Sequence, residues 1–177
     1  MFINRPTYAE VGYYAAAPQN GLWLNVLEKA YGIVRNDRRW FYRTSEPFDA
    51  TVKGRLDTST KDLTNHGVTT HGVKSNAAYQ PNAIKVDIAN ALARTKLVTA
   101  GSLAEWPWTR KNLADLPRSH AYTIIAYDPN LEPGQGGTLT IRNPWGQEGV
   151  PGHPYKGTFM MTVAQFKIKF AVLVFEN

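Results

Sequence analysis

The second half of the chain is a series of short strand-like runs, and this pattern restricts the fold more than any other feature. The runs "KLVTAG", "HAYTIIAYD", "GTLTIRN", "GTFMMTV" and "FAVLVFEN" follow one another from Lys96 onward and are rich in β-branched and aromatic residues. Loops containing glycine and proline separate them, and the loop "PNLEPGQGG" joins two runs that we expect to pair antiparallel. The sequence therefore predicts a small antiparallel β-sheet.

Helices are predicted ahead of this sheet. Apolar residues within 22–34 recur at helical spacing on one face. Ser59 and Asp62 have capping-box spacing, which predicts a short helix, and Pro81 is expected to open a longer one. The chain between these last two helices shows no regular pattern. We predict an α+β fold in which helices precede a small antiparallel sheet.

The overall composition is that of a folded domain. The chain has 177 residues, of which 43% are hydrophobic and 19% charged, values typical of a globular protein rather than a disordered one. No apolar run approaches the roughly 20 residues that cross a bilayer. The N-terminus lacks the apolar segment of a secretory signal. We therefore expect a soluble, cytoplasmic protein with no membrane partner.

The absence of cysteine and the net positive charge limit the kinds of site that the chain can form. The chain has no cysteine, which excludes disulfides, cysteine-ligated zinc and thiol catalysis by the chain itself. Its net charge is +6, and "RNDRRWFYR" at residues 35–43 mixes cations with aromatic residues. Nucleic-acid binding is one interpretation of this cluster. The other is a solvated loop whose aromatic residues turn into the core.

A histidine at the start of an apolar strand is the main candidate for chemistry. If Asp128 and Thr138 flank the hairpin turn, His120 and Asn143 lie at the far ends of the two paired strands, where their side chains can meet. An amide oxygen that accepts the ring N–H of a histidine fixes its orientation and tautomer, as a proton-transfer group requires. Trp145 could cover this pair and exclude water. The alternative is an ordinary strand histidine and a simple turn at "NPWG".

Four segments in this order resemble the papain-like calpain family of cysteine proteases. They are "GLWLNVLEKAYG", "SHAYTIIAYD", "IRNPWG" and "GTFMMTVAQFKIKF". The resemblance implies a papain-like second lobe over residues 20–177, preceded by an extension over residues 1–20. It further implies that His120 exchanges a proton with a cysteine nucleophile, that Asn143 orients His120, and that Trp145 shields them. The last segment would form a closing strand and a helical turn before the final strand.

The chain departs from the family in one essential part. It contains neither a cysteine nor the upstream segment that holds the family's nucleophile. Ser119 is not expected to replace it, because a neighbour along a strand projects to the opposite face from His120. We expect part of a calpain-like endopeptidase that is inactive alone and needs an upstream cysteine-bearing lobe to cleave a peptide substrate. It could be a fragment, a subunit or a degenerate relative. The alternative is a catalytically dead module that binds peptides or anionic partners such as nucleic acid.

We expect no cofactor. Calpains use calcium, partly through acidic residues after the catalytic Asn and Trp, but the corresponding loop "GQEGVPGHPYKG" has a single carboxylate, Glu148. Calcium prefers six to eight oxygen ligands. Asp62, His66 and His71 could in principle offer three ligands to zinc. Without cysteine or a firm helix to set their spacing, we interpret this segment as a polar turn.

Overall fold

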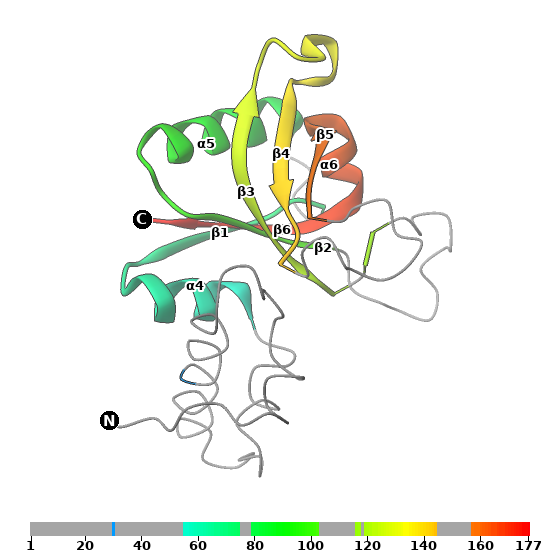
Figure 1. Cartoon of the computed structure of the whole chain (residues 1–177). Helices are drawn as coiled ribbons and strands as arrows, with labels where there is room; N and C mark the ends of the chain where they lie inside the picture. The colour runs from blue at the N-terminus through cyan, green and yellow to red at the C-terminus, as the bar shows by residue number, and fades with distance from the viewer. Residues whose placement is uncertain (1–29, 31–54, 75–78, 103–115, 118, 145–156) are drawn as a thin grey trace. The chain divides into compact units, whose positions relative to one another are not determined.

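The structure, a computed structural model, describes residue 30 and residues 55–74, 79–102, 116–117, 119–144 and 157–177 (Figure 1). The chain divides into two compact units, Met1–Gly54 and Arg55–Asn177. Within the first unit only Ala30 is described, and it is helical, as expected for residues 22–34. The predicted boundary at residue 20 and the basic cluster at residues 35–43 lie outside the described residues.

The second unit is a mixed α+β structure. Its elements in chain order are α4 (Leu56–Thr64), β1 (Val68–Gly72), α5 (Pro81–Ala93), β2 (Val98–Ser102), β3 (Ala121–Asp128), the short 3-10 helix η3 (Pro133–Gln135), β4 (Thr138–Arg142), β5 (Thr158–Thr162), α6 (Val163–Lys169) and β6 (Phe170–Glu176). The strands form one six-stranded sheet in the order β1-β6-β2-β3-β4-β5. Every neighbouring pair is antiparallel. The predicted fold class is confirmed.

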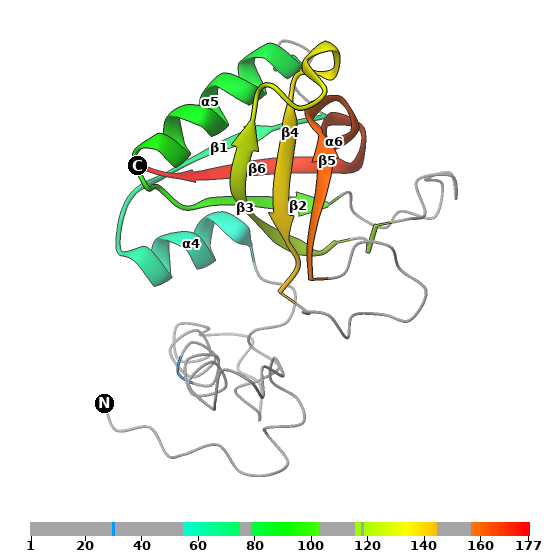
Figure 2. The same cartoon turned by 45° about the horizontal axis from the view of Figure 1, so that its top comes forward.

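The two faces of the sheet are covered by different helices (Figures 1 and 2). Successive residues of β2 point to opposite faces. Val98 and Ala100 join the apolar core, which includes Ile84 and Ile88 of α5. Thr99, between them, instead contacts α4, where its hydroxyl lies 3.2 Å from that of Thr60. The main core therefore lies between the sheet and the helices α5 and α6.

The predicted start of α4 is wrong. The helix begins three residues earlier than Ser59, with Arg55 as its N-cap and no side-chain cap. Ser59 lies inside the helix, where its hydroxyl donates to the carbonyl oxygen of Arg55 at 2.9 Å. Asp57 is the acidic residue of the first turn, and a negative charge there interacts favourably with the helix dipole.

The predicted irregular chain before Pro81 contains a strand. β1 pairs only with β6 among the described residues, so it is an edge strand of the sheet. Thr69 and Thr70 at its centre are exposed. An edge strand with exposed side chains lacks the apolar alternation by which a strand is normally predicted. α5 does begin at Pro81, as predicted, and buries Ile84 and Ile88.

The β3–β4 hairpin has the predicted register. Asp128 pairs with Thr138 beside the turn, and Thr123 pairs with Arg142 toward the far end. The register shifts between Ile124 and Ala126, which marks a β-bulge. The hairpin therefore places the residue before β3 and the residue after β4 at the same end of the sheet.

The closing segment also follows the predicted order of strand, helix and final strand. Thr162 ends β5 and caps α6, because its hydroxyl accepts the N–H of Gln165 and the side chain of Gln165 accepts the N–H of Thr162. This is the capping box that the sequence pattern Thr-x-x-Gln predicts. β6 then returns between β1 and β2.

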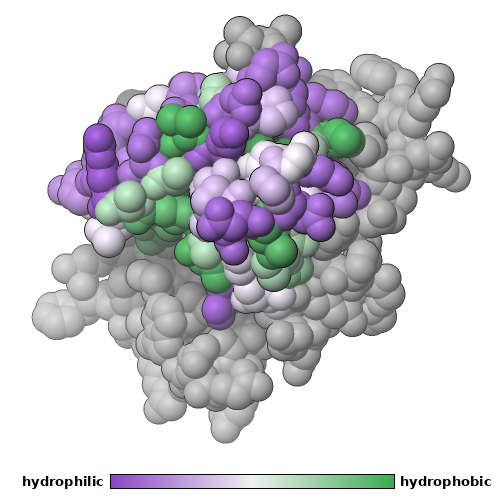
Figure 3. Space-filling view, turned by 90° about the horizontal axis from the view of Figure 1, so that it is seen from above, coloured by the Kyte–Doolittle hydropathy of each residue, from purple (hydrophilic) through white to green (hydrophobic). Residues whose placement is uncertain are grey.

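On the part of the surface that the structure describes, exposed apolar residues are scattered. In the space-filling view, small apolar areas lie between hydrophilic side chains (Figure 3). The large exposed hydrophobic residues belong to different segments and are Leu63, Val86, Ile125, Leu131, Met160 and Ile168. Among the described helices, none has the length and apolar character needed to cross a membrane.

Candidate functional site

His120 immediately precedes β3, and the end of β2 fixes its backbone. The N–H of Ser102 donates to the carbonyl oxygen of His120 at 2.9 Å. The N–H of His120 donates to the hydroxyl oxygen of Ser102, also at 2.9 Å. Both the N–H and the carbonyl oxygen of His120 are therefore hydrogen-bonded to Ser102 of the neighbouring strand.

Asn143 immediately follows β4 and is almost completely buried, with 2% of its surface exposed. Its N–H donates to the carbonyl oxygen of Gly157, next to β5, at 2.7 Å. Its side-chain oxygen Oδ1 lies 2.9 Å from Nε2 of His120. The predicted contact between these two side chains is confirmed.

This contact assigns a tautomer to the neutral imidazole. An amide oxygen can only accept, so Nε2 of His120 carries the hydrogen and donates it to Asn143. The other ring nitrogen, Nδ1, then carries no hydrogen in the neutral ring. A histidine held in this way can take a proton at Nδ1 without turning.

The ring of Tyr122 supports the imidazole from the side. The ring centroids of His120 and Tyr122 are 4.7 Å apart with their planes at 86°, an edge-to-face contact. Tyr122 is itself packed edge-on against Phe159 and Phe170. It is only 1% exposed, and its buried hydroxyl has no hydrogen-bond partner in the part of the chain that the structure describes.

The surroundings change the proton affinity of the histidine. Burial lowers the pKa of His120, because a charged imidazolium loses water on entering the protein, while the hydrogen bond to Asn143 raises that pKa in part. The net shift is downward. The buried surroundings therefore favour the neutral ring, which is the form that can accept a proton.

Trp145 and Ser119 are the other residues of this region that the sequence analysis considered. Trp145 lies outside the described residues, so its predicted shielding role stays a prediction. Ser119 was excluded as a nucleophile because it was predicted to lie beside His120 on a strand. That prediction is wrong, because Ser119 does not belong to a strand. It occupies a turn with φ of 52° and is exposed.

The histidines of the alternative zinc site have other roles. His66 hydrogen-bonds through Nδ1 to the carboxylate of Glu176. His71 stacks on Tyr79 with ring centroids 4.7 Å apart and planes at 13°. Among the described residues no three His, Cys, Asp or Glu side chains come together as metal ligands.

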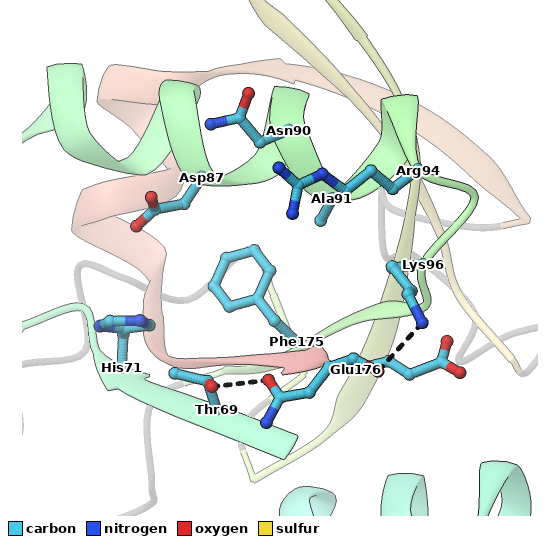
Figure 4. A pocket seen from close by; sticks show the side chains of 10 residues that line it. Thr69, His71, Asp87, Asn90, Ala91, Arg94, Lys96, Phe175 and Glu176 are labelled. Atoms are coloured by element: carbon cyan, nitrogen blue, oxygen red, sulfur yellow. Dashed lines mark hydrogen bonds between the residues drawn. The ribbon is translucent and has the colours of Figure 1, made fainter. Parts of the chain in front are cut away.

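A hollow of about 260 Å³ lies between α5 and the β1–β6 edge of the sheet (Figure 4). Phe175 and His71 come from the sheet, Asp87 comes from α5, and Arg94 is the C-cap residue of that helix. Much of its polar lining is already engaged, since Asp87 accepts the hydroxyl of Tyr79 at 2.8 Å. His120 and Asn143 do not line it, so this hollow is separate from the candidate site.

Two residues of the site were missed in the sequence. Tyr122 could have been found, because residues two apart on a strand lie on the same face. Ser102 has no local signal, since its place beside His120 depends on how β2 pairs with β3. Eighteen positions separate Ser102 from His120 in the chain.

A family model matches most of the chain. Residues 4–157 match the family described as calpain family cysteine protease. The chain belongs to the calpain family. The matched region covers most of the chain and includes both His120 and Asn143, so this calpain-family chain is related to cysteine proteases while containing no cysteine of its own. A search of curated proteins found no match.

Proposed function

We propose that this chain supplies the histidine–asparagine half of a calpain-like cysteine endopeptidase whose nucleophile comes from a separate upstream lobe. The observation that carries the proposal is the 2.9 Å hydrogen bond between Nε2 of His120 and Oδ1 of Asn143. It lies at the end of the sheet where paired strands finish. A partly buried imidazole with a fixed tautomer is the partner that a catalytic thiol requires.

The proposed reaction is cleavage of a peptide bond by acyl transfer. Nδ1 of His120 takes the proton of the cysteine thiol, and the thiolate attacks the substrate carbonyl carbon to form a carbon–sulfur bond. The imidazolium returns the proton to the leaving amine as the carbon–nitrogen bond breaks. Water, deprotonated by the same ring, then hydrolyses the thioester.

Asn143 and the buried surroundings have separate parts in this scheme. Asn143 accepts the Nε2 hydrogen in both the neutral and the protonated states, so the ring keeps one orientation through the cycle. Burial lowers the pKa of His120, and a thiolate placed beside the ring would offset that shift by stabilising the imidazolium. Trp145 would shield the pair from water.

By this proposal the chain alone cleaves nothing. The chain has no thiol to act as nucleophile, and by this proposal the cysteine-bearing lobe would also supply the donor that stabilises the oxyanion. In serine proteases, enzymes that lose a triad residue keep roughly 10³ to 10⁴-fold rate enhancement through the oxyanion hole and substrate binding. An oriented imidazole without either group is a poor catalyst of amide hydrolysis.

A catalytically dead binding module is the second candidate. The absence of cysteine and the net charge of +6 favour it. Such a module would hold peptides, or anionic partners such as nucleic acid attracted to the basic cluster at residues 35–43. It would bind without any dependence on His120 as a base.

Reconstitution distinguishes the two candidates. The chain alone, and the chain joined to a cysteine-bearing calpain-family lobe, are tested on a fluorogenic peptide library. We expect activity only in the reconstituted enzyme, with a loss of about 10³-fold or more on His120→Ala and little change on His71→Ala. If no cysteine-bearing lobe confers activity, while the chain binds peptide or RNA in a pull-down, the binding module is correct.

A further inference from the structure

We propose that Ser102 is a positioning residue for His120, acting through the backbone rather than the ring. Ser102 ends β2 and is 7% exposed. The β2–β6 register shifts between Gly101 and Ser102, so the chain departs from regular pairing at this point. The structural part of this proposal is independent of proteolysis, and only its activity test rests on the proposed function.

The hydroxyl of Ser102 connects two separate backbone groups. It accepts the N–H of His120 at 2.9 Å. Its own proton can serve one acceptor, and the carbonyl oxygen of Pro117 at 2.6 Å is closer than that of His120 at 3.3 Å. The hydroxyl is therefore used in both directions, as acceptor for His120 and as donor to Pro117.

This arrangement replaces a missing bond of the sheet. Gly101 and Ala121 are the last aligned pair of β2 and β3. In a regular hydrogen-bonded pair, Ser102 and His120 would exchange two bonds between their backbones. Here the N–H of Ser102 still donates to His120, but the N–H of His120 turns to the Ser102 side chain. A residue with a short side-chain acceptor is needed for this position.

The replacement matters because the chain turns sharply just before His120. Ser119 has φ of 52°, in the left-handed region that is unusual for residues other than glycine. The chain before His120 therefore cannot continue the β2–β3 ladder. Without the Ser102 hydroxyl, only one of the two backbone polar groups of His120 would remain tied to β2.

Three contacts then hold the histidine at three different points. Ser102 fixes the backbone, Tyr122 packs against the side of the ring, and Asn143 accepts the hydrogen of Nε2. A shift of the backbone would move the ring away from the buried Asn143, which its own backbone bond to Gly157 holds in place. Ser102 should therefore control how well the ring keeps one tautomer.

The test is nitrogen-15 NMR of the imidazole in the isolated chain. We expect Ser102→Ala to convert the single Nε2–H tautomer of His120 into a mixture of tautomers and to change the pH at which the ring titrates. Thr99→Val is the matched control, because it breaks a buried hydroxyl contact three positions away on the opposite face. It should leave the His120 signals unchanged.

Two further measurements complete the test. In the wild-type chain, the backbone N–H of His120 should exchange with solvent at least about 10² times more slowly than an unprotected amide, since it is held in a partly buried hydrogen bond. In the reconstituted enzyme, Ser102→Ala should lower kcat at least about tenfold with little change in KM. Ring signals of His120 that do not change in Ser102→Ala would overturn the proposal. If Ser102→Ala does not fold, fast exchange of the His120 N–H in the wild-type chain would overturn it instead. An effect on kcat alone, with unchanged NMR, would also contradict it.

Discussion

His120 and His71 occupy similar surroundings in different regions of the sheet, yet only one has the features of a proton-transfer group. Both are partly buried and both lie against a tyrosine ring with centroids 4.7 Å apart. His71 stacks face to face on Tyr79, whereas His120 adds a hydrogen bond to Asn143. An aromatic neighbour therefore packs a histidine, but a fixed acceptor is what selects its tautomer.

The tyrosines beside these two histidines, Tyr79 and Tyr122, differ in whether the hydroxyl group has a hydrogen-bond partner. Tyr79 donates its hydroxyl to Asp87 at 2.8 Å, at the rim of the hollow. The hydroxyl of Tyr122 is buried without a partner among the described residues. Among the described residues, the tyrosine near β1 and α5 has a hydrogen-bond partner and the histidine makes ring contacts, whereas at the start of β3 the histidine has the hydrogen bond and the tyrosine hydroxyl has none. The candidate site thus keeps its histidine oriented at the cost of a buried polar group, as functional sites often do.

Among the changes that compare the two regions, loss of the hydrogen-bond acceptor for His120 should have the largest effect. Asn143→Ala in the reconstituted enzyme should lower kcat by about 10²-fold, since an oriented proton-transfer group contributes roughly 10² to 10⁴-fold. Asp87→Asn, beside the other region's tyrosine, should change kcat by no more than about twofold. Steady-state cleavage of a fluorogenic peptide measures both. Equal losses would mean that the two regions do not differ in function.

The next effect concerns stability and has opposite signs in the two regions. Tyr122→Phe removes a buried hydroxyl without a partner and should raise the free energy of unfolding by about 1 kcal/mol. Tyr79→Phe removes a hydroxyl that donates to Asp87 and should lower it by about 1 kcal/mol. Urea unfolding compares the variants. Destabilisation by Tyr122→Phe would show that this hydroxyl has a stabilising partner.

The two regions should also respond to acid in different pH ranges. The pKa of His120 is lowered from 6.5, mainly by burial, so the unfolded chain takes up its proton more readily and stability falls as the pH drops below about 6.5. The pKa of Glu176 is lowered from 4.5, first by the N–H of Leu97 and then by His66. The contribution of the ionised Glu176 carboxylate to stability is therefore lost only as the pH falls below about 4.5.

Denaturant titrations between pH 7 and pH 4 separate these two ranges. His120→Gln should flatten the decrease that begins below about 6.5, whereas Glu176→Gln should flatten only the decrease below about 4.5. A His120→Gln variant with the wild-type pH dependence would refute the downward shift of the His120 pKa.

The smallest expected effect is that of calcium. The loop after Asn143 offers one carboxylate, Glu148, whereas calcium sites use six to eight oxygens. Micromolar calcium should therefore change neither the stability of the chain nor the NMR signals of His120. Titration calorimetry provides the direct measurement. A saturable heat that disappears on Glu148→Ala would show that this loop binds calcium after all.

Much of the site could be predicted because its central contact depends on local signals. Alternating apolar residues identify β3 and β4, and the turn between Asp128 and Thr138 sets their register. Once that register is known, His120 and Asn143 must lie at the same end of the hairpin. By contrast, β1 was missed because its exposed threonines lack strand alternation. The start of α4 was misplaced because Ser59 suggested a capping box, whereas the N-cap position is held by Arg55, which makes no side-chain cap.

The sequence by itself determined strands β2 to β6, the β3–β4 hairpin and the meeting of His120 with Asn143, because these follow from local patterns and from the turn that joins two successive strands. The tertiary structure alone decided which strand pairs beside β3, and hence that Ser102 holds the backbone of His120. It also decided the burial that lowers the pKa of His120 and that leaves the Tyr122 hydroxyl without a hydrogen-bond partner among the described residues. Desolvation and long-range strand pairing depend on distant segments packing together, and no local pattern records which segments those are.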